Sequence, residues 1–134
     1  MAEGLSVSLP LRIDTIDGAY GINKTFSQMA SQNLRMVILT SPGERVMYPE
    51  FGVGIRSYLF EQNTPATLGT IKQRIIQQVS TYLPYITLIN VNVGSPPIPG
   101  GLPGDTDNTR INISIRYSIP ALNIVSDLTI PVAL

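Results

Sequence analysis

Apolar and polar residues alternate one by one along the C-terminal third of the chain, which predicts β-strands there. The alternation is clearest over residues 111–119, where an isoleucine or a tyrosine takes every second position. It also runs through residues 87–93 and 124–132. A period of two is that of a strand with one face buried and one face in water. We therefore predict three strands in a small antiparallel sheet, with the last strand at an exposed edge because it carries Asp127 and Pro131.

Helical spacing replaces this alternation in the middle of the chain. Thr64-Pro65 is a strong start signal, since threonine caps a helix and proline suits its first position. Pro84 ends the same helix, because proline cannot continue it. The apolar stripe that defines this helix consists of Leu68, Ile71, Ile75, Val79 and Tyr82.

A second helix is predicted over residues 24–40, with Asn23 or Thr25 as its N-cap. Between the two long helices we expect a short strand at residues 45–48 and a short helix at residues 55–61. The apolar face of the second helix is expected to consist of Phe26, Met29, Ala30, Val37 and Ile38.

The connection between the long helices is rich in residues that fix the backbone. Pro42-Gly43 predicts a turn, and the proline after Tyr48 favours an extended conformation for that tyrosine. Gly52 and Gly54 mark positions where the backbone needs room or a positive φ. This pattern indicates a shaped connection rather than a slack loop.

Two further stretches complete the chain, which we treat as one domain, residues 1–134. Residues 1–22 read as an N-terminal extended arm, because apolar residues alternate up to Ile13 although Pro10 confines the arm to an edge or another surface. Residues 94–108 form a Pro/Gly-rich surface loop. The expected fold class is α+β, with the arm and the helices packed on a small C-terminal antiparallel sheet that has an exposed edge.

Composition narrows the functions that such a domain can have. The 134 residues include nine basic and nine acidic side chains, so the formal charge is zero and there is no electrostatic footprint for nucleic acid. There is no cysteine and no histidine, which removes thiolate zinc sites and the commonest general base. No stretch approaches the ~20 apolar residues of a membrane helix, and the start of the chain lacks the pattern of a signal peptide. We expect a protein made in a cytoplasm that works packed against neighbours, with no cofactor and no membrane partner.

Carboxylates are the remaining candidates for chemistry. Glu44, Glu50 and Glu61 lie near one another in the sequence, and a pair such as Glu44 and Glu50 could serve a lytic glycoside hydrolase. The favoured alternative pairs Glu44 with a nearby arginine such as Arg45 or Arg56, while the other two glutamates are solvated or serve packing. The acidic loop tip, Asp105 and Asp107 beside Asn108, lacks the rest of a calcium-loop pattern, and the loop glycines Gly100, Gly101 and Gly104 lack the context of a phosphate-binding loop.

The connection between the helices carries a family resemblance in three ordered pieces. With its N-terminal stretch Leu9 to Asp14, the chain resembles the baseplate-wedge proteins of contractile-tailed phages that start the tail sheath. That family is shared with type VI secretion baseplates and was once linked to lysozyme activity. The motif residues are Pro42, Gly43, Glu44 and Arg45, then Pro49, Glu50, Phe51 and Gly52, then Leu59, Phe60 and Glu61.

The resemblance implies a structural, non-enzymatic protein of the virion tail baseplate. It implies six copies around the tail tube, whose C-terminal strands template the first ring of sheath subunits by β-augmentation. A generic α+β interaction module and the glycoside hydrolase remain open as alternatives. The template strands would be residues 110–119 and 123–132, with sheath-binding positions Ile111, Ile113, Ile115, Tyr117, Ile124, Leu128, Ile130 and Val132.

The sequence departs from the family after the long helix. Members commonly carry Glu-Pro-Arg there, in contact with the wedge proteins, whereas this chain has Leu83-Pro84-Tyr85. Both charges are missing, so an apolar or aromatic contact by Leu83 and Tyr85 becomes the expected way of docking on the wedge.

Overall fold

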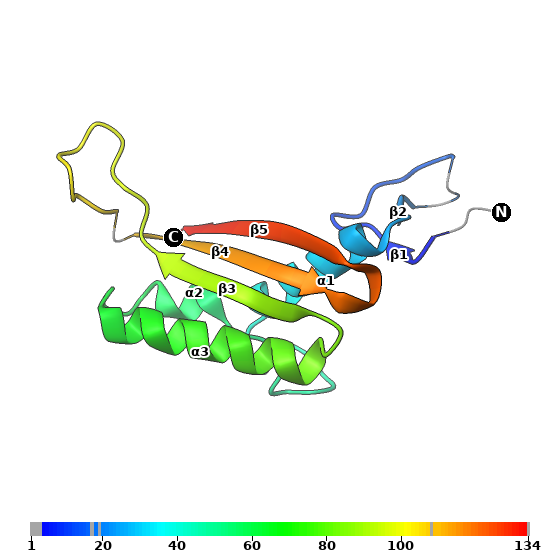
Figure 1. Ribbon diagram of the computed structural model, residues 1–134, viewed down its shortest axis with the longest axis horizontal. Coiled ribbons are helices and arrows are strands. Elements are labelled where there is room, and N and C mark those ends of the chain that lie inside the picture. The colour runs from blue at the N-terminus through cyan, green and yellow to red at the C-terminus, as the bar shows by residue number, and fades with distance from the viewer. Residues whose placement is uncertain (1–3, 17, 19, 108, 134) are drawn as a thin grey trace.

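The computed structural model describes residues 4–16, 18, 20–107 and 109–133, and in this part of the chain helices cover one face of an antiparallel sheet (Figure 1). The predicted α+β class is confirmed. In chain order the elements are β1 (Ser6–Val7), β2 (Ile22–Asn23), α1 (Phe26–Leu39), α2 (Ile55–Tyr58), α3 (Pro65–Tyr82), β3 (Thr87–Gly94), β4 (Arg110–Ile119), the 3-10 turn η1 (Pro120–Leu122) and β5 (Ile124–Ala133).

The main sheet has the strand order β3-β4-β5, so β4 is central and β5 lies at an edge, as the sequence predicts. β4 and β5 pair residue for residue from Arg110↔Ala133 to Ile119↔Ile124, without a register shift. The hairpin between them turns through η1 and Asn123, whose φ of 51° is in the left-handed region that asparagine tolerates.

The core lies between the sheet and the helices. Every second residue of β4 is buried, and Tyr117 is only 1% exposed. Thr25 and Thr64 cap α1 and α3 as expected, each accepting a hydrogen bond from a backbone N–H three residues on. The expected inward position of Phe26 is wrong, because it is the first residue of α1 and its side chain is half-exposed. The helical part of the core consists of Ala30, Leu34, Val37 and Ile38 from α1 and Ile71, Ile75 and Val79 from α3.

β3 departs from the predicted alternation because it contains a bulge. Leu88 pairs with Tyr117 and Asn90 with Arg116, which leaves Ile89 as an extra residue. An inserted residue flips the side chains on one side of it to the opposite face, so Ile89 is exposed where strict alternation would bury it.

The arm is only partly a strand. Among its described residues Ser6–Val7 pairs with Ile22–Asn23, and the remainder of the predicted extended arm is irregular. Residues 1–3, 17 and 19 lie outside the described part. Gln32 of α1 fixes this arm by hydrogen bonds. Its Oε1 accepts from the Leu9 N–H at 2.9 Å, and its Nε2 donates to the Val7 carbonyl at 3.1 Å.

Candidate functional site

The segment between α1 and α3, residues 41–64, is called the connector here, and its backbone is bonded to α1. The Val53 N–H donates to the Val37 carbonyl and the Gly54 N–H to the Thr40 carbonyl, both at 3.0 Å. Gly52 has a φ of 106°, and a Cβ at this position would overlap the carbonyl oxygen of Thr40. The prediction that Gly52 and Gly54 need special backbone geometry is confirmed, since Gly54 also has a positive φ.

A buried glutamine holds the connector on α3. Gln78 is only 5% exposed, its Oε1 accepts from the Gly52 N–H at 3.0 Å, and its Nε2 donates to the Glu50 carbonyl at 3.2 Å. The apolar stripe predicted for α3 omits this residue because glutamine counts as polar. Its spacing is the signal that could have found it, since Gln78 lies seven residues after buried Ile71 and three after buried Ile75.

Aromatic rings pack where the connector meets the end of α3. The rings of Phe51 and Tyr82 meet edge to face with centroids 4.9 Å apart, and Tyr48 meets Tyr82 at 6.5 Å. The Arg45 guanidinium lies 4.3 Å from the centroid of Phe51, a cation–π contact. Together with residues of α1 and the arm, these side chains line a groove of about 440 Å³.

The tip of the connector corrects two predictions. Residues 45–48 do not form a strand, and Tyr48 has a φ of 61° instead of an extended backbone. The reason is a pair of local hydrogen bonds. The Gly43 N–H donates to the Pro49 carbonyl and closes a loop that contains Tyr48, and the Phe51 N–H donates to the Tyr48 carbonyl and closes a turn that begins at this residue. Val46 and Met47 are strongly exposed at this tip.

The glutamates of the connector do not form a catalytic pair in any groove described here. The Glu44 carboxylate accepts from the Ser41 N–H at 2.9 Å and so closes the turn at Pro42-Gly43. The expected ion pair of Glu44 with Arg45 or Arg56 is wrong, because Glu44 instead bonds to the backbone of its own turn. Glu50 and Glu61 are exposed.

The third motif piece is divided between core and surface. Leu59 is 7% exposed and packs in the core, whereas the Phe60 side chain is 82% exposed beside Glu61. A single exposed apolar side chain is common on protein surfaces, so Phe60 alone does not mark a contact.

The expected sheath-binding side chains lie mainly in the chain's own core. β4 is hydrogen-bonded to β3 on one side and to β5 on the other, so it has no free edge. Of the two strands expected to act as the template, only β5 can therefore pair with another chain. The buried side chains therefore hold the strands on the core and cannot contact a partner. Only the backbone and the outward side chains of β5 can contact a partner. Ile124 is half-buried, and the buried members are Ile111, Ile113, Ile115, Tyr117, Leu128, Ile130 and Val132.

Pro131 shows which backbone groups of β5 point outward. A proline has no N–H to give to the β4 ladder, yet the register continues without a shift past Asn112↔Pro131. The Pro131 nitrogen therefore faces away from β4, and by the period of two so do the N–H groups of Val125, Asp127 and Thr129.

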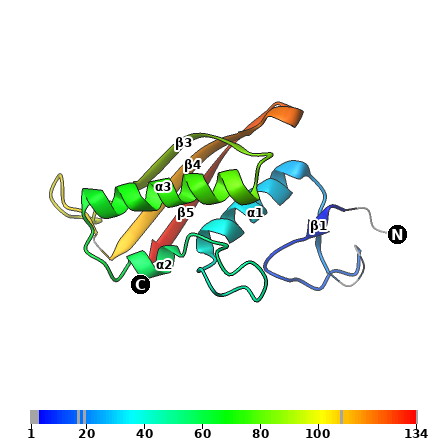
Figure 2. The same cartoon turned by 90° about the horizontal axis from the view of Figure 1, so that it is seen from below.

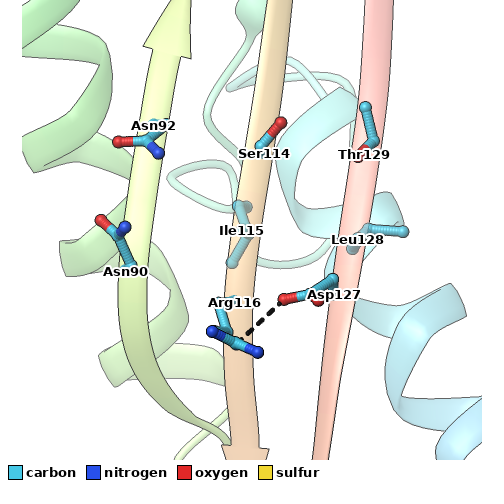
Figure 3. A pocket seen from close by; sticks show the side chains of 8 residues that line it. All are labelled: Asn90, Asn92, Ser114, Ile115, Arg116, Asp127, Leu128 and Thr129. Atoms are coloured by element: carbon cyan, nitrogen blue, oxygen red, sulfur yellow. Dashed lines mark ion pairs between the residues drawn. The ribbon is translucent and has the colours of Figure 1, made fainter.

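Two surfaces adjoin this strand. The sheet face opposite the helices is polar, with Asn90, Asn92, Ser114 and Arg116 beside Asp127 and Thr129, and the Arg116–Asp127 ion pair spans 3.3 Å across it (Figure 3). On the helical side a groove of about 420 Å³ runs along the end of β5 and is lined by Arg35, Leu39, Arg56, Ile130, Pro131 and Val132.

The three residues after α3 differ in what they can contact. Leu83 is 7% exposed and belongs to the core, whereas Pro84 is exposed. Tyr85 is 38% exposed, and its hydroxyl accepts from the Asn33 side-chain amide at 3.0 Å. Of these three residues, Pro84 and Tyr85 can therefore contact another protein while the domain stays folded, whereas Leu83 cannot.

The loop at residues 94–108 has internal hydrogen bonds, and its position 108 lies outside the described residues. The Asp105 carboxylate accepts from the Leu102 N–H at 3.1 Å. Hydrogen bonds from the side chain and backbone of Thr109 lower the pKa of Asp107. Among the described residues no cluster of metal-binding side chains is found, and no helix there has the length and apolar character to span a membrane.

The chain is similar to proteins of contractile tails. The family model of baseplate wedge protein gp25 matches residues 27–123. A curated relative, baseplate wedge protein gp25 of Enterobacteria phage T4, is 36% identical over 83 residues, which cover 62% of this chain and 56% of the relative. The aligned region thus spans little more than half the length of that relative.

Two solved structures share the fold. A crystal structure from Geobacter sulfurreducens, named as a candidate tail lysozyme, has a TM-score of 0.67 and 26% identity over 84% of this chain and 95% of that chain. The cryo-EM structure of the anti-feeding prophage baseplate, 6-fold symmetrised, has a TM-score of 0.68 and 23% identity over 84% and 82% of the two chains.

Proposed function

Because the chain belongs to the baseplate wedge protein gp25 family, we propose that it is a structural protein of a virion tail baseplate whose β5 edge starts the tail sheath. The edge would receive an extended strand from a sheath subunit, so that the two chains share one sheet. The observation that carries this proposal is the regular, bulge-free course of β5 along its whole length at the sheet edge.

The two edges of the sheet differ in a way that favours addition at β5. The other edge strand, β3, has a bulge at Ile89, and bulges are a common means of blunting an edge against pairing. β5 has no such interruption, and Pro131 removes only one outward donor near its end.

The edge can supply a moderate free energy per subunit. The outward groups of Val125, Asp127 and Thr129 allow about six hydrogen bonds, which at a net ~0.5–1.5 kcal/mol each give roughly 3–9 kcal/mol. Ordering the partner strand and bringing two chains together consume much of that. A durable joint therefore follows from repetition around a ring, for which we propose six copies surrounding the tail tube.

The exposed surface that follows α3 is the proposed contact with the wedge proteins. Pro84 and Tyr85 are exposed after α3, and the apolar connector tip, Val46 and Met47, offers a further contact. Tyr85→Ala should weaken binding to the purified wedge partner, with Asn33→Ala reporting the loss of the internal hydrogen bond alone. Undiminished binding of Tyr85→Ala would remove this contact from the proposal.

A proline substitution tests the sheath role without removing core residues. Thr129→Pro deletes an outward N–H of β5, whereas Thr129→Val changes the same side chain and keeps that N–H. We expect both variants to fold and to enter baseplates, and only Thr129→Pro to give baseplates without sheath in electron micrographs. Normal sheath growth on Thr129→Pro baseplates would contradict the proposal.

A lytic activity is not part of the proposal, because the Glu44 carboxylate is bonded to the backbone of its own turn. Glu44→Gln and Glu50→Gln should leave sheath assembly intact. If the wild-type protein digested cell walls and either substitution abolished that activity, the glycoside hydrolase hypothesis would be supported instead. A generic interaction module would show no association with any sheath subunit.

A further inference from the structure

The groove at the end of β5 contains two arginines from different elements. Arg35 lies on α1 one turn before Leu39, and Arg56 lies on α2. Figure 2 shows α1 and α2 next to β5 on the helical side of the sheet. Both arginines therefore line the same groove at the end of β5.

Neither arginine has an acidic partner among the described residues, although other arginines of the chain do. Arg110 pairs with Asp107 at 3.4 Å, and Arg116 pairs with Asp127 at 3.3 Å. Arg35 and Arg56 are both exposed, so the chain places two like charges at one groove without compensating them. This arrangement is complementary to a negative charge brought by a partner.

The geometry of strand addition determines where that charge would lie. Side chains directly opposite each other on paired strands share one face of the sheet. Ile130 and Val132 face the helices, so a partner side chain opposite either of them also points to the helical side, into the groove beside Leu39.

We infer that this groove recognises an aspartate or glutamate side chain on the sheath strand, held between Arg35 and Arg56. The inference rests on the proposed function and adds the chemical identity of the partner residue. Arginine suits this role because its planar, permanently charged group donates several hydrogen bonds to a carboxylate.

Equilibrium binding of the purified cognate sheath subunit tests the inference. The double variant Arg35→Gln/Arg56→Gln should bind roughly 5–20-fold more weakly at low salt, and the difference should shrink at high salt. The control Arg12→Gln/Lys72→Gln removes two positive charges elsewhere and should bind like wild type. Each acidic residue in the extended segments of the sheath subunit is then changed to its amide, and one of these changes should cause no further loss in the arginine double variant.

The outcomes separate this inference from the function on which it rests. If Thr129→Pro abolishes binding but the arginine double variant binds within about twofold of wild type, strand addition stands and acid recognition is overturned. If Thr129→Pro also binds normally, both are overturned. An equal loss of binding affinity in the Arg12→Gln/Lys72→Gln control would show general charge attraction and would likewise overturn recognition of an acidic side chain by the groove.

Discussion

Replacing Gln78 with leucine tests how the connector is held on α3. Leucine has a similar size and remains buried, but it can neither accept from the Gly52 N–H nor donate to the Glu50 carbonyl. The two groups left behind are not equivalent. Gly52 is buried, so its N–H stays unsatisfied, whereas Glu50 is exposed and its carbonyl can bond to water.

The magnitude follows from this difference. An unsatisfied buried donor costs about 1–3 kcal/mol, and the exposed carbonyl adds little. For a domain of this size each kcal/mol lowers the Tm by roughly 3–4 °C, so we expect a fall of about 3–12 °C.

Thermal unfolding followed by circular dichroism measures the effect, with Gln77→Leu as the matched control. Gln77 is the preceding residue of α3 and is exposed, so its replacement should change the free energy of unfolding by less than ~0.5 kcal/mol. A Tm for Gln78→Leu equal to that of Gln77→Leu would refute the claim that Gln78 fixes the connector.

Other predictions concern backbone geometry and pH. Gly52→Ala should destabilise the protein by roughly 3 kcal/mol or more in urea unfolding, through a left-handed φ and a steric overlap. Gly69→Ala, at an open helical position, should instead stabilise it by ~0.5–1 kcal/mol, and the reverse order would contradict this assignment. NMR titration should give Asp107 a pKa below its ordinary value that rises in Thr109→Ala. Because the folded pKa is depressed, its contribution to stability is present above the unfolded pKa and is lost as pH falls through the folded one.

Elements with a strong period could be predicted from the sequence, because burial of one face dominates their formation. The three strands, the caps at Thr25 and Thr64, and the edge position of β5 all follow from local patterns. The bulge at Ile89 could not be predicted, because it depends on the register in which β3 pairs with β4 and the sequence of β3 alone does not show that register.

The candidate site was predictable in its glycines but not in its polar contacts. Gly52 could be predicted because glycine in a connection often marks a positive φ or a close approach of the backbone. The role of Gln78 depends on a residue 26 positions away, and the turn at Tyr48 depends on backbone bonds that override the preference of a residue before proline. The sequence could not show that only β5 can serve as the template strand. That conclusion needs the strand order, which places β4 in the centre of the sheet.

Amide hydrogen exchange in β5 tests the central claim most directly. The measurement compares the N–H groups of Val125, Asp127 and Thr129 in the free protein and in the complex with its sheath subunit. We predict fast exchange in the free protein and strong protection of these alternate residues in the complex, because each gains a backbone partner. Unchanged exchange at all three amides in a complex shown to contain bound sheath subunit would contradict the account.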